Sequence, residues 1–318
     1  MDAPSWSTIL FYLALGFTFL WLGASWLVSG SSRVARGMGV SPLVIGLTIV
    51  AWGTSAPEVM VTLTSAKKGT AAVGLGNILG SNIANIGLVL GSCALVLPRI
   101  LEGRMALREI GWLFVSVGAL WAVAFDLDVT RLDAVILLLV FAVHNVHLWR
   151  TSGIEESADD AKATMKDWIA IVAGAVGIYY GCNFAVDGAV AGAERLSIPP
   201  LVIGLTVVAV GTSLPELAAG LRSAFVGESD ISLGNVVGSN VFNTLGVLGI
   251  VGLVHPLTDE SVRVALRSAL DKDFPLVLVF SAAVVLFTWL APGRGGRLKG
   301  GLLLLGWMGY TAWLYATS

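Results

Sequence analysis

Two glutamates lie inside long apolar runs of the sequence, each at the end of nearly the same string. Glu58 ends the string Gly46-LTIVAWGTSAPE, and Glu216 ends the string Gly204-LTVVAVGTSLPE, 158 residues further on. An ionised carboxylate in hydrocarbon is costly unless it faces a cavity, a partner or an ion. A single glutamate of this kind could be protonated and hydrogen-bonded between helices. Two glutamates at matched positions instead predict a functional site.

A threonine precedes each glutamate by four residues. Thr54 and Glu58 have this spacing, and Thr212 and Glu216 repeat it. Side chains spaced i, i+4 project from one face of a helix. We therefore expect each repeat to present a hydroxyl and a carboxylate to the same space.

A proline lies directly before each glutamate, at Pro57 and Pro215. Proline has no backbone N–H to donate, so the carbonyl groups of Gly53 and Gly211 lose their usual helical partners. Free carbonyl groups are tolerated at membrane depth only where they line a cavity or meet a ligand. A proline kink alone could simply shape a helix. Its repetition beside both glutamates favours a helix break that turns backbone oxygens toward the site.

A second polar string follows each glutamate, GNILGSNIAN ending at Asn85 and GNVVGSNVFN ending at Asn243. Ser81 and Asn85 are four residues apart, as are Ser239 and Asn243, so each pair shares a helix face. These side chains could serve only helix packing, through interhelical hydrogen bonds or back-bonding to the preceding turn. Placed opposite the glutamates, they would supply hydroxyl and amide oxygens to the same site.

Together the two repeats offer carboxylate, hydroxyl, amide and carbonyl oxygens, without sulfur or imidazole. Such a set suits Ca²⁺, which takes 6–8 oxygen ligands, and also Na⁺. Zinc, copper and iron sites would favour histidine or cysteine. Two glutamates neutralise one Ca²⁺, two Na⁺ or two H⁺. The predicted site is therefore an oxygen cage for a transported cation, and no bound cofactor is expected.

The composition predicts the elements that position these residues. The chain has 318 residues, 56% of them hydrophobic and 13% charged, whereas soluble domains carry about 25% charged residues. We expect an all-α integral membrane protein that spans the lipid bilayer with ten transmembrane helices. The formal net charge of −2 gives no reason to expect nucleic acid as a partner. The predicted spans lie near residues 8–29, 42–66, 71–97, 109–127, 132–149, 168–190, 200–224, 231–255, 274–291 and 299–316.

The ten spans divide into two halves of five. Roughly 31 of the 58 positions in 41–98 are identical to their counterparts in 199–256, always at the same offset. We predict a first half at 1–150, a linker at 151–167 and a second half at 168–318. Five is an odd number, so the second half enters the membrane from the opposite side. The repeats are therefore predicted to be inverted, as in many secondary transporters.

The distribution of basic residues predicts the orientation. The loops on the side of the 151–167 linker hold twelve of the 19 Lys and Arg residues, and the opposite loops hold seven. The positive-inside rule then places this linker in the cytoplasm and both termini outside it. We expect a multi-pass protein of the cell's inner (plasma) membrane that functions as a monomer.

The paired strings Gly53-TSAPE with Gly80-SNIAN, and Gly211-TSLPE with Gly238-SNVFN, closely resemble the two alpha-repeats of the calcium/cation antiporter superfamily. The nearest group is that of prokaryotic sodium/calcium exchangers. The resemblance implies a non-enzymatic antiporter that exchanges Ca²⁺ for Na⁺ by alternating access, with the first and sixth spans sliding across the other eight. The cation ligands that it implies are Glu58, Glu216, Thr54, Thr212, Ser81, Ser239, Asn85, Asn243 and the carbonyls of Ala51 and Ala209.

One position departs from the pattern of many sodium/calcium exchangers, which have aspartate where this chain has Asn243. With asparagine at both Asn85 and Asn243, the cage carries a formal charge of −2 from its two glutamates. Protons could then replace Na⁺, so a Ca²⁺/H⁺ antiporter is the main alternative. A passive cation channel and an intramembrane acid–base enzyme are further alternatives; inverted repeats around one acidic site disfavour the channel, and the lack of an HExxH string disfavours the enzyme.

Overall fold

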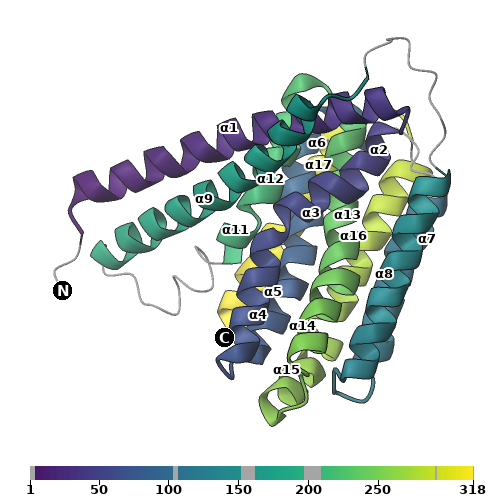
Figure 1. The fold of residues 1–318 in the computed structure, drawn as a ribbon. Helices are drawn as coiled ribbons and strands as arrows, with labels where there is room; N and C mark the ends of the chain where they lie inside the picture. Colours follow the sequence, from purple (N-terminus) through teal and green to yellow (C-terminus); the bar gives the residue numbers. More distant parts are fainter. Residues whose placement is uncertain (1–3, 103–106, 152–161, 197–208, 291, 318) are drawn as a thin grey trace.

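The computed structural model describes residues 4–102, 107–151, 162–196, 209–290 and 292–317. Its regular elements in these ranges are all helices (Figure 1). The one strand-like contact there is an isolated antiparallel bridge between Val129 and Leu257, which joins two loops. The all-α prediction is confirmed for the described part of the chain.

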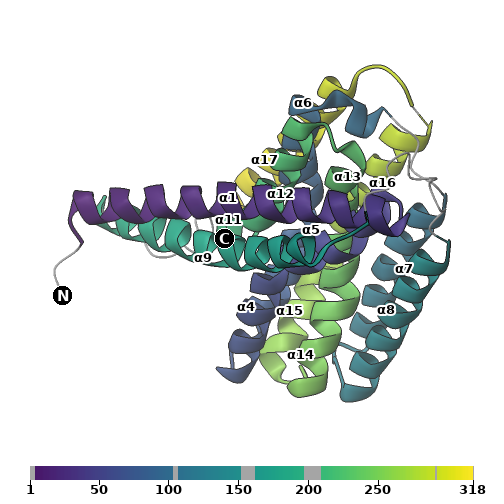
Figure 2. The same cartoon turned by 45° about the horizontal axis from the view of Figure 1, so that its top comes forward.

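Two long helices, α1 (Trp6–Met38) and α9 (Met165–Arg195), lie side by side and extend beyond the remaining helices (Figures 1 and 2). They are antiparallel, because Gly16 lies against Ala185 and Gly30 against Asp167. The contact is very close: a Cβ on Gly23 would lie 2.8 Å from the carbonyl oxygen of Gly174. Both helices are longer than predicted, because each continues beyond its apolar stretch into a charged end.

The first glutamate lies in a broken span. Its pieces are α2 (Pro42–Ile45), the π-helical turn η1 (Gly46–Val50), α3 (Ala51–Thr54) and α4 (Ala56–Lys67). Helices α2–α3 and α4 meet at Ser55 with a bend of 44°. The second half breaks in the same way at Ser213, between α11 (Ala209–Thr212) and α12 (Leu214–Val226). Residues 200–208, the predicted start of that span, lie outside the described residues.

The break corrects one expectation. Thr54 ends α3 and Glu58 lies in α4, so they belong to two helical pieces and do not share one continuous helix face. The same holds for Thr212 and Glu216. Proline in the first turn of a helix is compatible with its missing N–H, and it ends the preceding helix instead. The sequence predicted a kink at each proline, but it did not predict that one helix would end and another begin there.

The second polar strings form two nearly continuous helices. One is built from α5 (Ala71–Ala84), η2 (Asn85–Leu90) and α6 (Gly91–Val96), the other from α13 (Ser229–Val241), η5 (Phe242–Val247) and α14 (Leu248–Val254). The segments η2 and η5 are π-helical turns, a feature frequent at functional sites. Asn85 begins the first and Asn243 lies in the second.

Helix α13 crosses η1 at close range, because a Cβ on Gly238 would lie 2.4 Å from the carbonyl oxygen of Leu47. Only glycine allows this approach. It brings the second polar string of one half against the broken span of the other.

The remaining elements complete the bundle: η3 (Pro98–Leu101), α7 (Leu107–Ala124), α8 (Arg131–Thr151), α15 (Glu260–Asp271), α16 (Asp273–Val285), the π-turn η6 (Leu286–Leu290) and α17 (Gly296–Thr317). Helix α15 was not predicted. It buries Val262, Leu266 and Ala269 on one face and exposes charged residues on the other, so its mean hydropathy hides it from a search for apolar spans.

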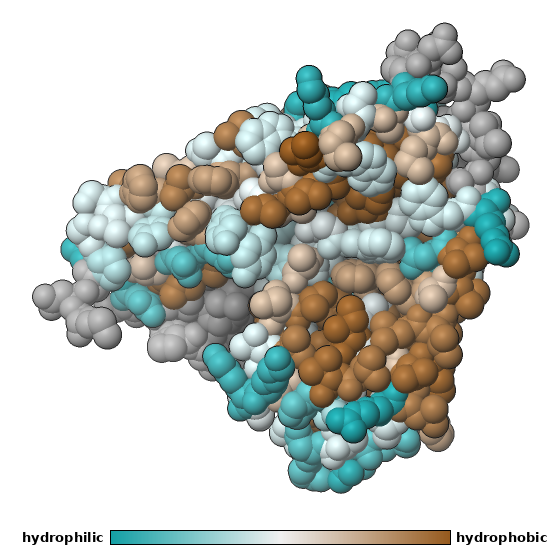
Figure 3. All heavy atoms as spheres, viewed as in Figure 1, coloured by the Kyte–Doolittle hydropathy of each residue, from teal (hydrophilic) through white to brown (hydrophobic). Residues whose placement is uncertain are grey.

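The surface of the bundle is suited to a bilayer. Figure 3 shows a broad hydrophobic area over the helices, with hydrophilic residues gathered above and below it. Among the described residues, five helices are long and apolar enough to cross a membrane. A sixth span is added if the bent pair Pro42–Thr54 and Ala56–Lys67 crosses the membrane as one unit. The other predicted spans coincide with shorter or less apolar helices. The count of ten crossings therefore stays a prediction.

Candidate cation site

The helix breaks place both glutamates in the interior of the protein. Glu58 is the third residue of α4 and Glu216 the third residue of α12, and both side chains are fully buried. The first turn of a helix leaves backbone N–H groups without intrahelical partners and carries the positive end of the helix dipole. This position favours a carboxylate and explains in part why the interior tolerates one.

Glu216 is held by the opposite half of the molecule. The hydroxyl of Ser55 donates to its Oε1 at 2.7 Å, and the hydroxyl of Ser239 lies 3.5 Å from the same atom. The side-chain amide of Asn235 donates to the Glu216 backbone oxygen at 3.3 Å. Because Ser55 lies at the break of the first half, this hydrogen bond joins the two broken spans directly.

Thr54 joins the same network from the end of α3. Its hydroxyl donates to Oδ1 of Asn235 at 3.1 Å and lies 3.5 Å from the hydroxyl of Ser239. It also lies 3.2 Å from the carbonyl oxygen of Ala51, which accepts the backbone N–H of Ser55 at 3.0 Å as well. Thr54, Ser239 and Glu216, predicted from separate motifs, thus meet at one point.

Glu58 has a different environment. Neither of its carboxylate oxygens has a hydrogen-bond partner among the residues that the structure describes. The carboxylate interacts electrostatically with Glu216, whose charge repels it, and with the hydroxyl of Ser81. A fully buried carboxylate whose nearest charged neighbour repels it is unfavourable by several kcal/mol unless a counter-charge balances it. These oxygens are therefore available to a cation.

Asparagines from both halves close the site on the side of α5 and α13. The amide of Asn85 donates to Oδ1 of Asn240 at 3.2 Å, and the amide of Asn82 donates to the hydroxyl of Thr244 at 2.9 Å. The amide of Asn240 in turn donates to the backbone oxygen of Asn82 at 3.2 Å. These contacts run antiparallel between the matched helices. They fix the wall that carries Asn85.

Several buried oxygens of the predicted ligand set have no donor within the described part of the chain. Besides the two oxygens of Glu58, these are Oε2 of Glu216, Oγ of Ser81, Oδ1 of Asn85 and Oδ1 of Asn243. Buried polar atoms are normally hydrogen-bonded, so a group of orphan acceptors requires an explanation. A cation that takes oxygen ligands satisfies it. The described residues contain no cluster of three or more His, Cys, Asp or Glu side chains, so any such site relies on hydroxyl, amide and carbonyl oxygens.

Two predicted ligands are less well defined. Ala209 begins α11, and its side-chain surroundings lie outside what the structure describes. Thr212 ends α11 and is buried.

Two residues that were not predicted as ligands, Ser55 and Asn235, contact the site. Both lie within the repeated strings, and Ser55 stands between the threonine and the proline, so the repetition itself was the signal that could have found them.

The chain matches known proteins over nearly all of its length. The family model "Sodium/calcium exchanger protein" matches residues 8–150 and 166–316. CaxA of Alkalimonas amylolytica, named as a candidate antiporter, is 35% identical over 96% of this chain and 98% of its own length. The sodium/calcium exchanger MaX1 of Methanosarcina acetivorans is 30% identical over 95% of this chain and 96% of its own length.

The fold also matches a solved structure. The sodium-calcium exchanger NCX_Mj, soaked with Na⁺ and without Ca²⁺, superposes with a TM-score of 0.80 at 30% identity, covering 96% of this chain and 98% of that one. The all-helical fold, the paired motifs and these matches agree. The chain belongs to the sodium/calcium exchanger family of membrane antiporters.

Proposed function

We propose that this protein exchanges Ca²⁺ for Na⁺ across the membrane through a single oxygen-lined site between its two halves. The observation that carries the proposal is the buried pair Glu58 and Glu216: Glu58 has no hydrogen-bond partner among the described residues, and Glu216 accepts a hydrogen bond from Ser55 of the opposite half. Two carboxylates match the charge of one Ca²⁺ or two Na⁺. Competition for the same carboxylates would make the binding of the two ions mutually exclusive.

The proposed ligands are those that the resemblance to the exchanger family implies, and the contacts of Thr54, Ser239 and Glu216 support part of the set. Glu58 and Glu216 bind either ion, and Thr54 and Thr212 add hydroxyl and backbone oxygens. Asn85 and Asn243 line the middle of the site. Flanking Na⁺ positions use Ser81 and Ser239 with the carbonyls of Ala51 and Ala209.

We further propose that ten transmembrane helices form two inverted repeats around this site. The antiparallel packing of α1 on α9 supports this arrangement, because these helices are counterparts in the two halves. The antiparallel contacts of Asn82 and Asn85 with Thr244 and Asn240 support it in the same way. In this architecture the α1–α9 pair slides across the remaining helices to expose the site alternately to each side. The protein acts as a monomer in the inner (plasma) membrane of the cell. Both of its termini lie outside the cytoplasm.

A second candidate, Ca²⁺/H⁺ exchange, rests on the two amides. With Asn85 and Asn243 in the middle of the site, the formal charge of the cage is −2, so three Na⁺ would leave the loaded carrier with a net positive charge. Two protons on the glutamates would neutralise it as well as two Na⁺ do.

Radiolabelled Ca²⁺ uptake into proteoliposomes distinguishes these readings. The proposal predicts uptake when the vesicles are loaded with Na⁺ and little uptake when Na⁺ is equal on both sides. Uptake that follows an imposed pH gradient and ignores Na⁺ would contradict Na⁺ coupling and establish the H⁺ alternative. Rapid Ca²⁺ flux without any counter-ion gradient would contradict exchange altogether and indicate a channel.

A further inference from the structure

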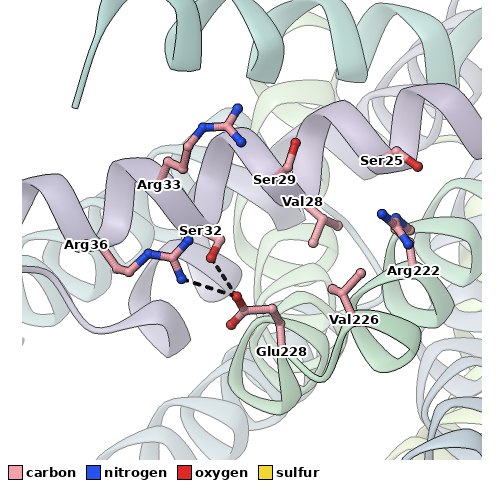
Figure 4. Close-up of a pocket in the computed structure, with 9 residues that line it drawn as sticks. All are labelled: Ser25, Val28, Ser29, Ser32, Arg33, Arg36, Arg222, Val226 and Glu228. Carbon is pink, nitrogen blue, oxygen red and sulfur yellow. Dashed lines mark hydrogen bonds and ion pairs between the residues drawn. The ribbon is translucent and has the colours of Figure 1, made fainter. Parts of the chain in front are cut away.

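A pocket lies along the C-terminal part of α1, and neither Glu58 nor Glu216 lines it. A cavity of about 150 Å³ opens there between α1, α12 and the residue that precedes α13 (Figure 4). Its lining combines three arginines, three serines, two valines and a single carboxylate, that of Glu228. Among them are Ser32, Arg33, Arg36, Arg222, Val226 and Glu228. This lining is strongly cationic.

The single carboxylate of the lining is already engaged. Glu228 accepts a hydrogen bond from the hydroxyl of Ser32 at 2.6 Å and pairs with Arg36 at 3.5 Å, as Figure 4 shows. Arg33 pairs with Asp167 at the start of α9. Two of the three arginines therefore have a counter-charge.

The third arginine, Arg222, has no acidic partner among the described residues. Its guanidinium lies over the ring of Trp21 at 5.5 Å, and its buried Nε has no hydrogen-bond partner in the described part of the chain. In Figure 4 it stands at the end of the pocket near Ser25, apart from the Glu228 cluster. A planar guanidinium with free donors is well suited to a phosphate group.

The rim of the pocket beside Arg222 is apolar and exposed. Trp21 and Phe225 have ring centroids 6.2 Å apart, and their side chains are 51% and 59% exposed. Val226 and Trp26, on the same two helices, are exposed as well. Exposed aromatic side chains beside basic residues are typical of the level at which a membrane protein meets lipid headgroups. The surroundings thus provide an anion site and an apolar surface next to it.

We propose that the phosphate of an anionic membrane phospholipid binds in this pocket. Its oxygens accept hydrogen bonds from Arg222, while an acyl chain lies along Trp21 and Phe225. A free phosphate would use the arginines but not the aromatic surface. A zwitterionic lipid would bring its own positive charge into a cationic pocket. The bound lipid joins α1 to α12, the helix that also carries Glu216.

The test is native mass spectrometry of the detergent-purified protein with phosphatidylglycerol, phosphatidylcholine or inorganic phosphate. We expect phosphatidylglycerol to remain bound through detergent washing and phosphatidylcholine to be lost. Arg222→Gln should reduce phosphatidylglycerol retention about tenfold, since it removes a charge-assisted pair of hydrogen bonds. The matched control Arg131→Gln removes an exposed arginine at the start of α8 and should retain the lipid as the unaltered protein does.

A second variant covers the case in which Arg222→Gln fails to fold. Val226→Phe keeps every charge and narrows the cavity from its wall, so it should also lose phosphatidylglycerol. Equal retention by Arg222→Gln and Arg131→Gln would overturn the proposal, as would equal retention of the two lipids. Displacement of the lipid by millimolar inorganic phosphate, with no effect of Val226→Phe, would reassign the pocket to a free anion.

Discussion

The two broken spans have nearly the same sequence but different contacts. In the second half, the carboxylate of Glu216 accepts a hydrogen bond from the hydroxyl of Ser55 and lies close to the hydroxyl of Ser239. In the first half, the carboxylate of Glu58 accepts no hydrogen bond within the described residues. The hydroxyl of Ser213, the counterpart of Ser55, also has no hydrogen-bond partner among them. Asn235 joins Thr54 to Glu216, whereas its counterpart Asn77 contacts Thr62.

This difference shows that sequence symmetry does not produce structural symmetry. An inverted-repeat carrier in either of its end states places its two halves in different conformations. The observed asymmetry fits one such state, in which the carboxylate of the second half is tied to the first half and that of the first half is free for a cation. The following experiments test whether the two glutamates differ in this way and still serve one site.

The largest expected effect is on transport. Glu58→Gln and Glu216→Gln should each lower Ca²⁺ uptake about 100-fold, because each removes one of two charges that balance the ion in a buried site. Uptake into Na⁺-loaded proteoliposomes measures this. Glu194→Gln, at an exposed position of α9, is the control and should transport normally. Substantial uptake by both single variants would refute the shared site.

The second effect separates the two glutamates. Without Ca²⁺ or Na⁺, Glu58→Gln should stabilise the protein by about 2 kcal/mol, since it removes an unpaired buried charge and its repulsion of Glu216. Glu216→Gln should stabilise less, because the charged acceptor of Ser55 becomes a neutral one. Thermal unfolding in ion-free buffer measures the difference. Equal stabilisation by the two variants, or greater stabilisation by Glu216→Gln, would show that the two glutamates do not differ in this way.

The third effect concerns the matched serines at the helix breaks. Ser55→Ala removes a hydrogen bond to a charged group and should lower stability by about 1.5–3 kcal/mol. Ser213→Ala removes a hydroxyl with no partner within the described residues and should change stability by less than about 0.5 kcal/mol. Chemical denaturation of both variants gives the comparison. Equal losses of stability in the two variants would mean that the hydroxyl groups of Ser55 and Ser213 have equivalent contacts in the folded protein.

The smallest expected effect is on the stability of the second half, at the start of helix α15. Asp259 caps this helix, and the hydroxyl of Ser261 and the backbone N–H of Val262 hold the pKa of its carboxyl below the usual value. A lowered folded-state pKa adds stability above the unfolded pKa of about 4 and loses it as pH falls through the folded one. Asp259→Ala should therefore be less stable by about 1 kcal/mol at neutral pH.

This loss should disappear in strong acid, which thermal unfolding at several pH values would detect. Ser5→Ala removes the cap of α1, which does not titrate, and should show a loss that is independent of pH. A pH-independent loss for Asp259→Ala would contradict the capping role of its charge.

The sequence predicted the helical class, the position of each apolar segment in the described ranges and the convergence of Glu216, Thr54 and Ser239. These follow from hydrophobic runs and from a repeated motif. It did not predict helix α15, whose amphipathic pattern has low mean hydropathy. It also did not predict which glutamate would be paired, because identical strings cannot encode a difference between their own conformations. Ser55 and Asn235 acquire their roles only through contacts between halves.

The central claim is that both halves build one cation site, and the stoichiometry of Ca²⁺ binding tests it most directly. Isothermal titration of the purified protein should give one Ca²⁺ per chain, with binding lost in Glu58→Gln and also in Glu216→Gln. If each half instead held its own ion, the unaltered protein would bind two Ca²⁺ and each single variant would keep one. Retention of one Ca²⁺ by either variant would contradict the account.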